Sequence, residues 1–138
     1  KDYKEYYPNY MKNVLIVGGI VVIAGLMYIY QTSTVSTVLS GNDFVSQHAS
    51  TQDAVMLDVR TSAEYADGHI AGSINLDVQD PTFVDELNKL DKSQTLFVYC
   101  RSGSRSAVAV SLMKKNGFEK VYELKGGVVG NNIPLTNQ

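Results

Sequence analysis

The only cysteine of the chain, Cys100, stands between an apolar run and a cluster of small and basic residues. The run is Thr95-Leu-Phe-Val-Tyr99, which predicts a buried strand, and the cluster is Arg101-Ser-Gly-Ser-Arg-Ser106. Residues 107–116 then predict a helix that is closed by Gly117. A strand, a tight loop and a helix start with a thiol at the turn together predict an anion site that holds a nucleophile.

The surroundings of Cys100 favour the thiolate, which is the reactive form of cysteine. A free cysteine has a pKa of about 8.5, and a helix N-terminus or nearby arginines lower it to roughly 3.5–7.5. Gly103 and the serines permit a tight turn, so the backbone N–H groups of residues 101–106 can point inward. Arg105 adds a permanent positive charge, and Ser104 or Ser106 is a candidate N-cap of the following helix. The alternative is a buried core cysteine without a reactive role.

The segment Cys-Arg-Ser-Gly-Ser-Arg-Ser at 100–106 resembles the active-site loop of single-domain rhodaneses, which are thiosulfate and persulfide sulfurtransferases. Three other segments resemble motifs of this family in the expected order, and the resemblance covers roughly residues 36–135. They are Leu57-Asp-Val-Arg60, the stretch 64–76 with its Glu-Tyr, Gly-His-Ile, Gly-Ser and Asn75, and Leu124-Lys-Gly-Gly127 followed by Pro134. Many members carry a tryptophan soon after the Gly-Gly pair, where this chain has Val128-Val129.

The resemblance implies a sulfurtransferase in which Cys100 is the catalytic residue and carries a persulfide. A small anionic donor, thiosulfate or a persulfide, would bind the loop Arg101, Ser102, Gly103, Ser104, Arg105 and Ser106, with the two arginines holding its negative charge. A thiol or a cyanide-like acceptor would then remove the sulfur in ping-pong fashion. The alternative is a non-catalytic rhodanese-like module that binds a partner or senses sulfur compounds.

The spacing of the loop separates sulfur chemistry from phosphate chemistry within this resemblance. Related phosphatases and some arsenate reductases have five residues between the cysteine and the arginine, whereas four separate Cys100 from Arg105 here. A shorter loop leaves less room beside the sulfur and favours the terminal sulfur of a persulfide over a phosphate. Asp58, Arg60 and Glu64 are candidates for a supporting charge network, and His69 and Tyr65 are interpreted as structural. No metal and no organic cofactor are expected.

Charge and cysteine content restrict the partners. The net charge is −2, yet residues 93–138 contain six Lys or Arg against two Glu, while residues 36–92 are acidic. A basic half around the loop attracts anionic donors. Basic residues are not interleaved with aromatics, so nucleic acid is not an expected partner. With a single cysteine the chain has no internal disulfide and no resolving cysteine, so the sulfur acceptor must come from outside.

The N-terminal region contains an uncharged apolar segment at residues 14–30. Counted from Met11 it spans about 20 residues, or roughly 30 Å as a helix, which matches a bilayer core. Lysines lie before it, and no Lys or Arg follows until Arg60, so the positive-inside rule predicts a membrane anchor with the catalytic domain outside the cytoplasm, in a periplasmic or extracellular space. A signal peptide that is cleaved to leave a secreted protein, and a buried element of a soluble fold, remain alternatives.

We therefore predict four parts: an N-terminal polar flank at 1–13, a transmembrane or signal-anchor helix at 14–30, a linker at 31–36 and a rhodanese domain at 37–138. Within the domain, strands at 37–39, 54–58, 73–76, 95–99 and 120–124 alternate with helices at 40–48, from Thr61 or Ser62, and at 80–90 after an Asp80 N-cap and Pro81. This α/β pattern predicts a rhodanese-like parallel sheet of about five strands with helices on both faces. Cys100 is then expected at the carboxyl ends of the strands, where active sites of such sheets lie.

Overall fold

The computed structural model describes residues 3–31 and 35–137, and these two ranges belong to two separate compact units of the chain. Residues 32–34, inside the predicted linker, lie outside the described residues. The predicted strand at 37–39 begins earlier than expected, because β1 covers Val35–Leu39. The end of the predicted linker is therefore part of the sheet.

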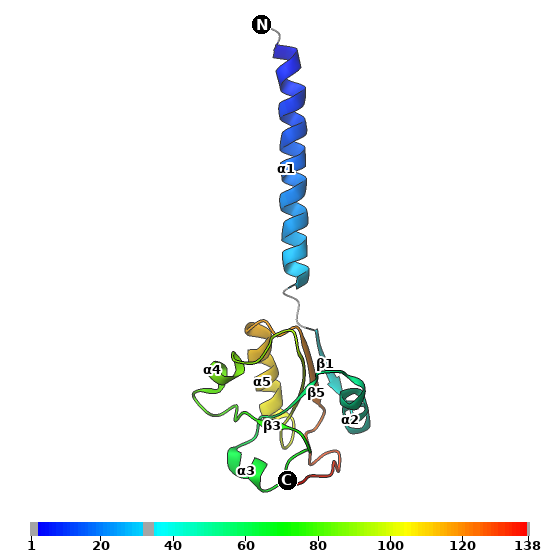
Figure 1. Cartoon of the computed structure of the whole chain (residues 1–138), viewed down its shortest axis with the longest axis vertical. Coiled ribbons are helices and arrows are strands. Elements are labelled where there is room, and N and C mark those ends of the chain that lie inside the picture. Colours follow the sequence, from blue (N-terminus) through cyan, green and yellow to red (C-terminus); the bar gives the residue numbers. More distant parts are fainter. Residues whose placement is uncertain (1–2, 32–34, 138) are drawn as a thin grey trace. The chain divides into compact units, whose positions relative to one another are not determined.

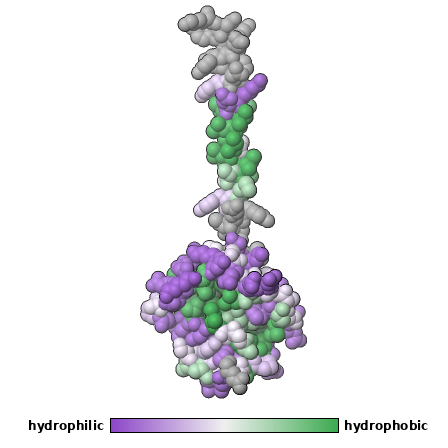
Figure 2. Space-filling view, viewed as in Figure 1, coloured by the Kyte–Doolittle hydropathy of each residue, from purple (hydrophilic) through white to green (hydrophobic). Residues whose placement is uncertain are grey.

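The first unit contains one helix, α1 (Tyr3–Gln31), which confirms the predicted apolar helix (Figure 1). Its segment Tyr10–Ile29 has a mean hydropathy of 2.0 and is long enough to cross a membrane, by length and composition only. A signal sequence near an N-terminus meets the same criterion. Apolar side chains cover the middle of this helix in Figure 2.

The second unit is an α/β domain around a five-stranded sheet in the order β1-β5-β4-β2-β3, in which all paired strands are parallel. The predicted fold class is confirmed. The remaining strands are β2 (Val55–Asp58), β3 (Ile74–Asn75), β4 (Thr95–Tyr99) and β5 (Lys120–Leu124). The helices are α2 (Gly41–Ser50), α3 (Ser62–Ala66), α4 (Phe83–Leu87) and α5 (Ser104–Lys115).

Two helix starts differ from the sequence prediction. The helix expected at 80–90 is shorter, since the carboxylate of Asp80 accepts hydrogen bonds from the backbone N–H and the hydroxyl of Thr82 and so stabilises a turn before α4. The helix expected at 107–116 begins at Ser104, with Gly103 as its N-cap. Gly117 does follow its end, with φ +83°.

Alternating residues of the sheet supply two apolar clusters, one on each face. Leu96, Val98 and Cys100 pack with residues of α4 and α5, whereas Phe97 and Tyr99 pack with Phe44 of α2. Figure 1 shows α4 and α5 on the face of the sheet opposite α2. Because side chains alternate along a strand, this two-sided burial fixes the register of β4 and the position of Cys100 at its end.

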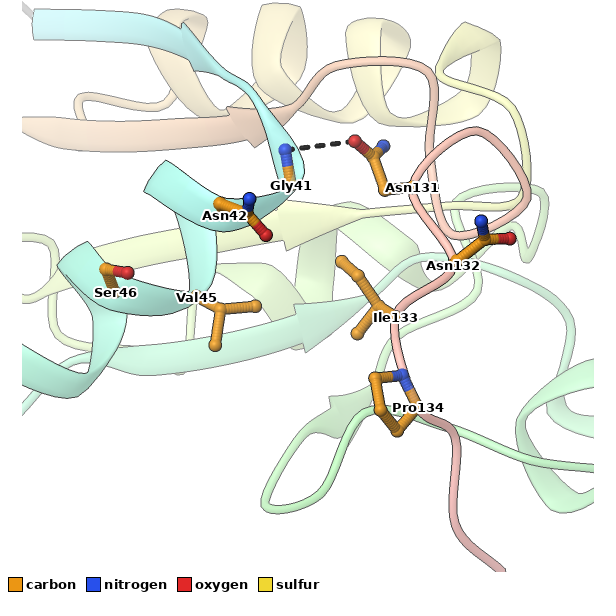
Figure 3. A pocket seen from close by; sticks show the side chains of 8 residues that line it. All are labelled: Gly41, Asn42, Val45, Ser46, Asn131, Asn132, Ile133 and Pro134. Carbon is orange, nitrogen blue, oxygen red and sulfur yellow. Dashed lines mark hydrogen bonds between the residues drawn. The ribbon is translucent and has the colours of Figure 1, made fainter.

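A surface pocket of about 270 Å³ lies beyond the carboxyl ends of β1 and β5 (Figure 3). The first residues of α2 form one wall and residues 131–134 form the other. The backbone N–H of Gly41 donates to Asn131 Oδ1 across it, at 2.9 Å. None of the predicted site residues lines this pocket.

Candidate active site

Cys100 is the first residue after β4, and its side chain is fully buried in the loop that leads into α5. The loop turns back on the sulfur because Gly103 adopts φ +102°, a conformation that residues with a side chain rarely adopt. The backbone N–H of Gly103 donates to Cys100 Sγ at 3.1 Å. Neither candidate serine caps α5: Ser104 is its first helical residue, and the Ser106 hydroxyl lies near the sulfur, at 3.5 Å from Sγ.

The loop lowers the pKa of Cys100. Burial on its own raises the pKa of the thiol, since it penalises the charged form. Hydrogen bonding of the sulfur with the Ser106 side chain and with the backbone of Ser106, Gly103 and Ser102 lowers the pKa and outweighs this effect, so the pKa lies below its ordinary value. Of the N–H groups expected to point inward, that of Gly103 makes a hydrogen bond to the sulfur, at 3.1 Å.

The turn at Gly126 and Gly127 packs against the backbone of the cysteine loop at Cys100 and Arg101. The N–H of Val128 donates to the Cys100 carbonyl at 3.0 Å, and the N–H of Val129 donates to the Arg101 carbonyl at 3.1 Å. Gly127 has φ +60°, and a Cβ there would overlap the backbone of Arg101. The Gly-Gly motif is therefore needed for the close approach of this turn to the cysteine loop.

The two arginines of the loop have different surroundings. Arg105 forms a bidentate pair with Glu64, with Nη1 at 2.6 Å from Oε2 and Nη2 at 2.8 Å from Oε1. The side chain of Arg101 is exposed, and no ion pair involves it within residues 10–29 and 36–137. Arg105 thus already has a carboxylate partner, and the expectation that both arginines hold the donor stays a prediction.

Glu64 connects the start of α3 to the start of α5. Thr61 is the N-cap of α3, and its side chain and that of Glu64 form a reciprocal capping box, as the predicted helix start required. The same carboxylate holds Arg105, whose guanidinium lowers the pKa of Glu64 to about 2. Glu64 thus fixes the first turn of α5, to which Ser106 belongs.

The Glu64–Arg105 pair predicts a pH-dependent contribution to stability. Because the folded pKa lies below the ordinary value of 4.5, the contribution is present above that value and is lost as the pH falls toward about 2. We expect Glu64→Gln to destabilise the domain by about 1 kcal/mol at neutral pH, measured by urea unfolding, and the difference from wild type to shrink between these two pH values.

Glu119→Gln is the matched control, since Glu119 is exposed and lies just before β5. It should change stability little over the same pH range. A Glu64→Gln difference that stayed constant down to the lowest pH would contradict the ion pair.

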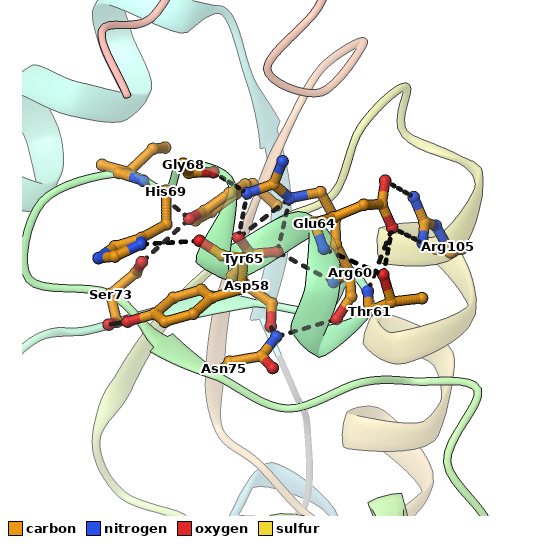
Figure 4. Close-up of polar contacts among 12 residues, drawn as sticks. Asp58, Arg60, Thr61, Glu64, Tyr65, Gly68, His69, Ser73, Asn75 and Arg105 are labelled. Carbon is orange, nitrogen blue, oxygen red and sulfur yellow. Dashed lines mark hydrogen bonds and ion pairs between the residues drawn. The ribbon is translucent and has the colours of Figure 1, made fainter. Parts of the chain in front are cut away.

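Asp58 and Arg60 form a separate, buried pair at the end of β2 (Figure 4). Arg60 Nη2 lies 2.6 Å from Asp58 Oδ2 and also donates to the Gly68 carbonyl at 2.6 Å. Asn75 donates to the backbone carbonyls of Asp58 and Arg60, at 3.0 and 2.9 Å. The three predicted supporting residues therefore belong to two pairs: Glu64 contacts the cysteine loop, whereas Asp58 and Arg60 hold the segment that follows β2.

The Gly-His-Ile motif has structural contacts, in agreement with its interpretation. His69 Nδ1 lies 3.0 Å from the Tyr65 carbonyl, and the two rings stack with centroids 3.9 Å apart. Tyr65 donates its hydroxyl proton to the Ser73 carbonyl at 2.6 Å. Across the part of the chain that the structure describes, no group of three or more His, Cys, Asp or Glu side chains is arranged to hold a metal ion.

Sequence reasoning missed Glu123. The hydroxyl of Ser106 lies 2.7 Å from Glu123 Oε1, so this carboxylate reaches the sulfur through one intervening side chain. The alternation of side chains along β5 could have indicated the face of the sheet on which Glu123 lies. Val121 belongs to the apolar cluster on the α5 face, and Glu123, two residues later, points the same way.

A buried thiol in a loop of inward N–H groups, at the carboxyl edge of a parallel sheet and at the start of a helix, defines a protein with a cysteine-based anion site. The comparisons with known proteins agree. The sequence profile of the Rhodanese-like domain family matches residues 42–131, so the chain belongs to the rhodanese-like family.

Three similar proteins illustrate this family. The chain is 32% identical over 81 residues to a "Sulfurtransferase" of Allochromatium vinosum, covering 59% of this chain and 74% of that protein. It is 33% identical over 106 residues to a "tRNA uridine(34) hydroxylase" of Buchnera aphidicola, covering 72% of this chain and 33% of that protein, so the chain spans about a third of this longer relative. The rhodanese-like domain of the Alr3790 protein from Anabaena sp. superimposes with a TM-score of 0.63 at 30% identity, covering 72% of this chain and 78% of that structure.

Proposed function

We propose that the domain transfers sulfane sulfur through a persulfide on Cys100. The Cys100 thiolate attacks the outer sulfur of a donor such as thiosulfate, a new bond forms between Sγ and that sulfur, and the S–S bond of the donor breaks as sulfite leaves with its electron pair. A thiophilic acceptor, a thiol or cyanide, then attacks the outer sulfur and releases the Cys100 thiolate. The observation that carries this proposal is the loop N–H of Gly103, aimed at Sγ from 3.1 Å.

The loop also supplies what an anionic donor and a persulfide need. Backbone N–H groups arranged before the reaction stabilise negative charge on sulfur without reorganisation. Arg101 is exposed and has no carboxylate partner among the side chains that the structure describes, so we assign it the first contact with the donor. Arg105, neutralised by Glu64, contributes mainly by holding the helix start in place.

The intact mass of the purified protein tests the proposal. After incubation with thiosulfate and removal of excess reagent, we expect the mass to rise by one sulfur atom and to fall back when cyanide or a thiol is added. The same protein should convert thiosulfate and cyanide into sulfite and thiocyanate over many cycles. A protein that gains no sulfur and shows no turnover would instead support the non-catalytic binding or sensing module.

We also propose that residues 14–30 anchor the domain to a membrane and that the domain lies outside the cytoplasm. The apolar length of Tyr10–Ile29 and the lysines that precede residue 14 support this proposal. We expect the expressed chain to sediment with membranes and to be released by detergent but not by high salt. A protease added to cells whose outer membrane or wall has been opened, and whose cytoplasmic membrane is intact, should degrade the domain. Recovery of the chain in the soluble fraction with residues 14–30 still attached would contradict the anchor.

A further inference from the structure

Cys100, Ser106 and Glu123 form a chain of hydrogen bonds that runs from the buried sulfur to β5. The thiol of Cys100 donates to Ser106 Oγ over 3.5 Å, and Ser106 Oγ donates to Glu123 Oε1 over 2.7 Å. Cys100 and Ser106 are fully buried, whereas Glu123 is half-buried. The chain therefore connects the nucleophile, through a side chain without access to water, to a carboxylate at the edge of the core.

The hydroxyl of Ser106 has one proton and three competing acceptors. Two of them, Glu123 Oε1 and the Gly103 carbonyl at 2.9 Å, are present whatever the state of the sulfur. The third is Cys100 Sγ, which becomes an acceptor only when the thiol has lost its proton. A hydrogen bond to a carboxylate is short and strong, so Glu123 is a strong competitor. When the proton of Ser106 points to Glu123, it does not stabilise a thiolate.

We propose that Glu123 is a positioning residue that, through Ser106, disfavours the free thiolate of Cys100 and thereby favours the sulfur-loaded form of the protein. This inference rests on the proposed function. In the persulfide, Sγ is bonded to both Cβ and the outer sulfur and carries no formal charge. The negative charge moves to the outer sulfur, about 2.05 Å further on.

The geometry of the loop separates the outer sulfur from Glu123. Ser106 occupies the side of Sγ that faces Glu123, so the added sulfur must lie in another direction. In the persulfide, the Ser106 hydroxyl can keep donating to Glu123, because Sγ is uncharged and does not need its proton. Glu123 destabilises the free thiolate in two ways: it competes for the proton of Ser106, and its negative charge repels the charge on Sγ. Both effects are weaker for the persulfide.

The other charges near the sulfur come from different elements. Arg105 of α5 interacts electrostatically with Cys100 and is paired with Glu64 of α3, and Asp77 also acts on Arg105. The strands on both sides of Glu123, β1 and β4, contribute no charged side chain, and Tyr99 is the only phenol on them. These groups are unchanged by a substitution at Glu123, so its effect reports on Glu123 itself.

A titration of the full chain tests the link to Ser106 without any sulfur donor. The thiolate is followed by its ultraviolet absorbance in wild type and in Glu123→Gln, which keeps the size and removes the charge. We expect the thiolate population below the titration midpoint to rise about a hundredfold in Glu123→Gln, because the two hydrogen bonds place the charges about 6 Å apart and the effective dielectric constant is about 20. Glu119→Gln, which is exposed and outside the loop, should titrate like wild type.

The Ser106→Ala background shows whether the effect passes through the hydroxyl. There, Glu123→Gln should change the thiolate population by less than half as much on a logarithmic scale. If Glu123→Gln does not fold, Glu123→Asp withdraws the carboxylate by one methylene and should shift the titration in the same direction by a smaller amount. An unchanged titration, or one that moves to higher pH, overturns the inference.

The loading equilibrium tests the second half of the inference. In mixtures of thiosulfate and sulfite, intact mass measures the ratio of persulfidated to free protein. We expect this ratio to fall several-fold in Glu123→Gln and to stay at the wild-type value in Glu119→Gln. An equal or higher ratio in Glu123→Gln overturns the preference for the loaded form. If wild type gains no sulfur at all, the proposed function fails, while the titration still decides whether Glu123 controls the thiol.

Discussion

Replacing Cys100 with serine should abolish sulfur transfer, with a loss of about 10⁴-fold or more in the turnover of thiosulfate and cyanide. A serine hydroxyl fits the loop and meets the same Gly103 N–H, so the fold should persist. It is not ionised at neutral pH and its oxygen does not accept sulfane sulfur, so the covalent intermediate is lost. The measurement is the rate of thiocyanate formation, together with intact mass after incubation with thiosulfate, in which no added sulfur is expected.

The control for this variant is Ser111→Ala, an exposed change on the same helix that starts at the loop. It should keep full turnover and the mass gain of one sulfur. Retention of more than about a tenth of wild-type turnover by Cys100→Ser would mean that the persulfide on Cys100 is not on the reaction path. The thermal unfolding of both variants should stay close to that of wild type.

The position of Cys100 was predictable because it depends on local signals and on a general rule of parallel sheets. An apolar run, small residues and a helix start place the thiol at a strand end, and strand ends of such sheets carry the sites. The start of α5 was not predicted correctly. Both serines are good N-caps in isolation, but Gly103 takes the cap position because its positive φ lets its N–H turn toward Sγ.

The charge pairs of the site depend on contacts that the sequence does not specify. Arg105 and Glu64 are 41 positions apart, and only the packing of α3 beside the start of α5 brings them together. The link between Ser106 and Glu123 likewise requires the register of β4 against β5, in which Val98 is opposite Glu123. Alternation along β5 predicts the face of Glu123, but not its partner. Asp58 and Arg60 are two residues apart, so their pairing is the one that local spacing made foreseeable.

Of the substitutions considered for stability, Asp58→Ala should have the largest effect: it should lower the free energy of unfolding in urea by about 3–5 kcal/mol. Arg60 is only 5% exposed, and the Nε and Nη2 groups of Arg60 donate hydrogen bonds to the carboxylate of Asp58. Without Asp58 the guanidinium keeps the Gly68 carbonyl, at 2.6 Å, and the face of the Tyr99 ring, at 5.7 Å from its centroid. Neither offsets a buried positive charge, because neither carries a full negative charge.

Two comparisons isolate the buried charge as the cause. Glu86→Ala removes the partner of Lys89 from an exposed pair and should cost less than about 1 kcal/mol, since water screens that interaction. The double variant Asp58→Leu with Arg60→Met removes both charges and should recover much of the stability lost by Asp58→Ala, as replacements of buried pairs by apolar side chains often do. If Asp58→Ala cost no more than Glu86→Ala, Arg60 would have to reach water in the folded protein, and the segment after β2 would not depend on this pair.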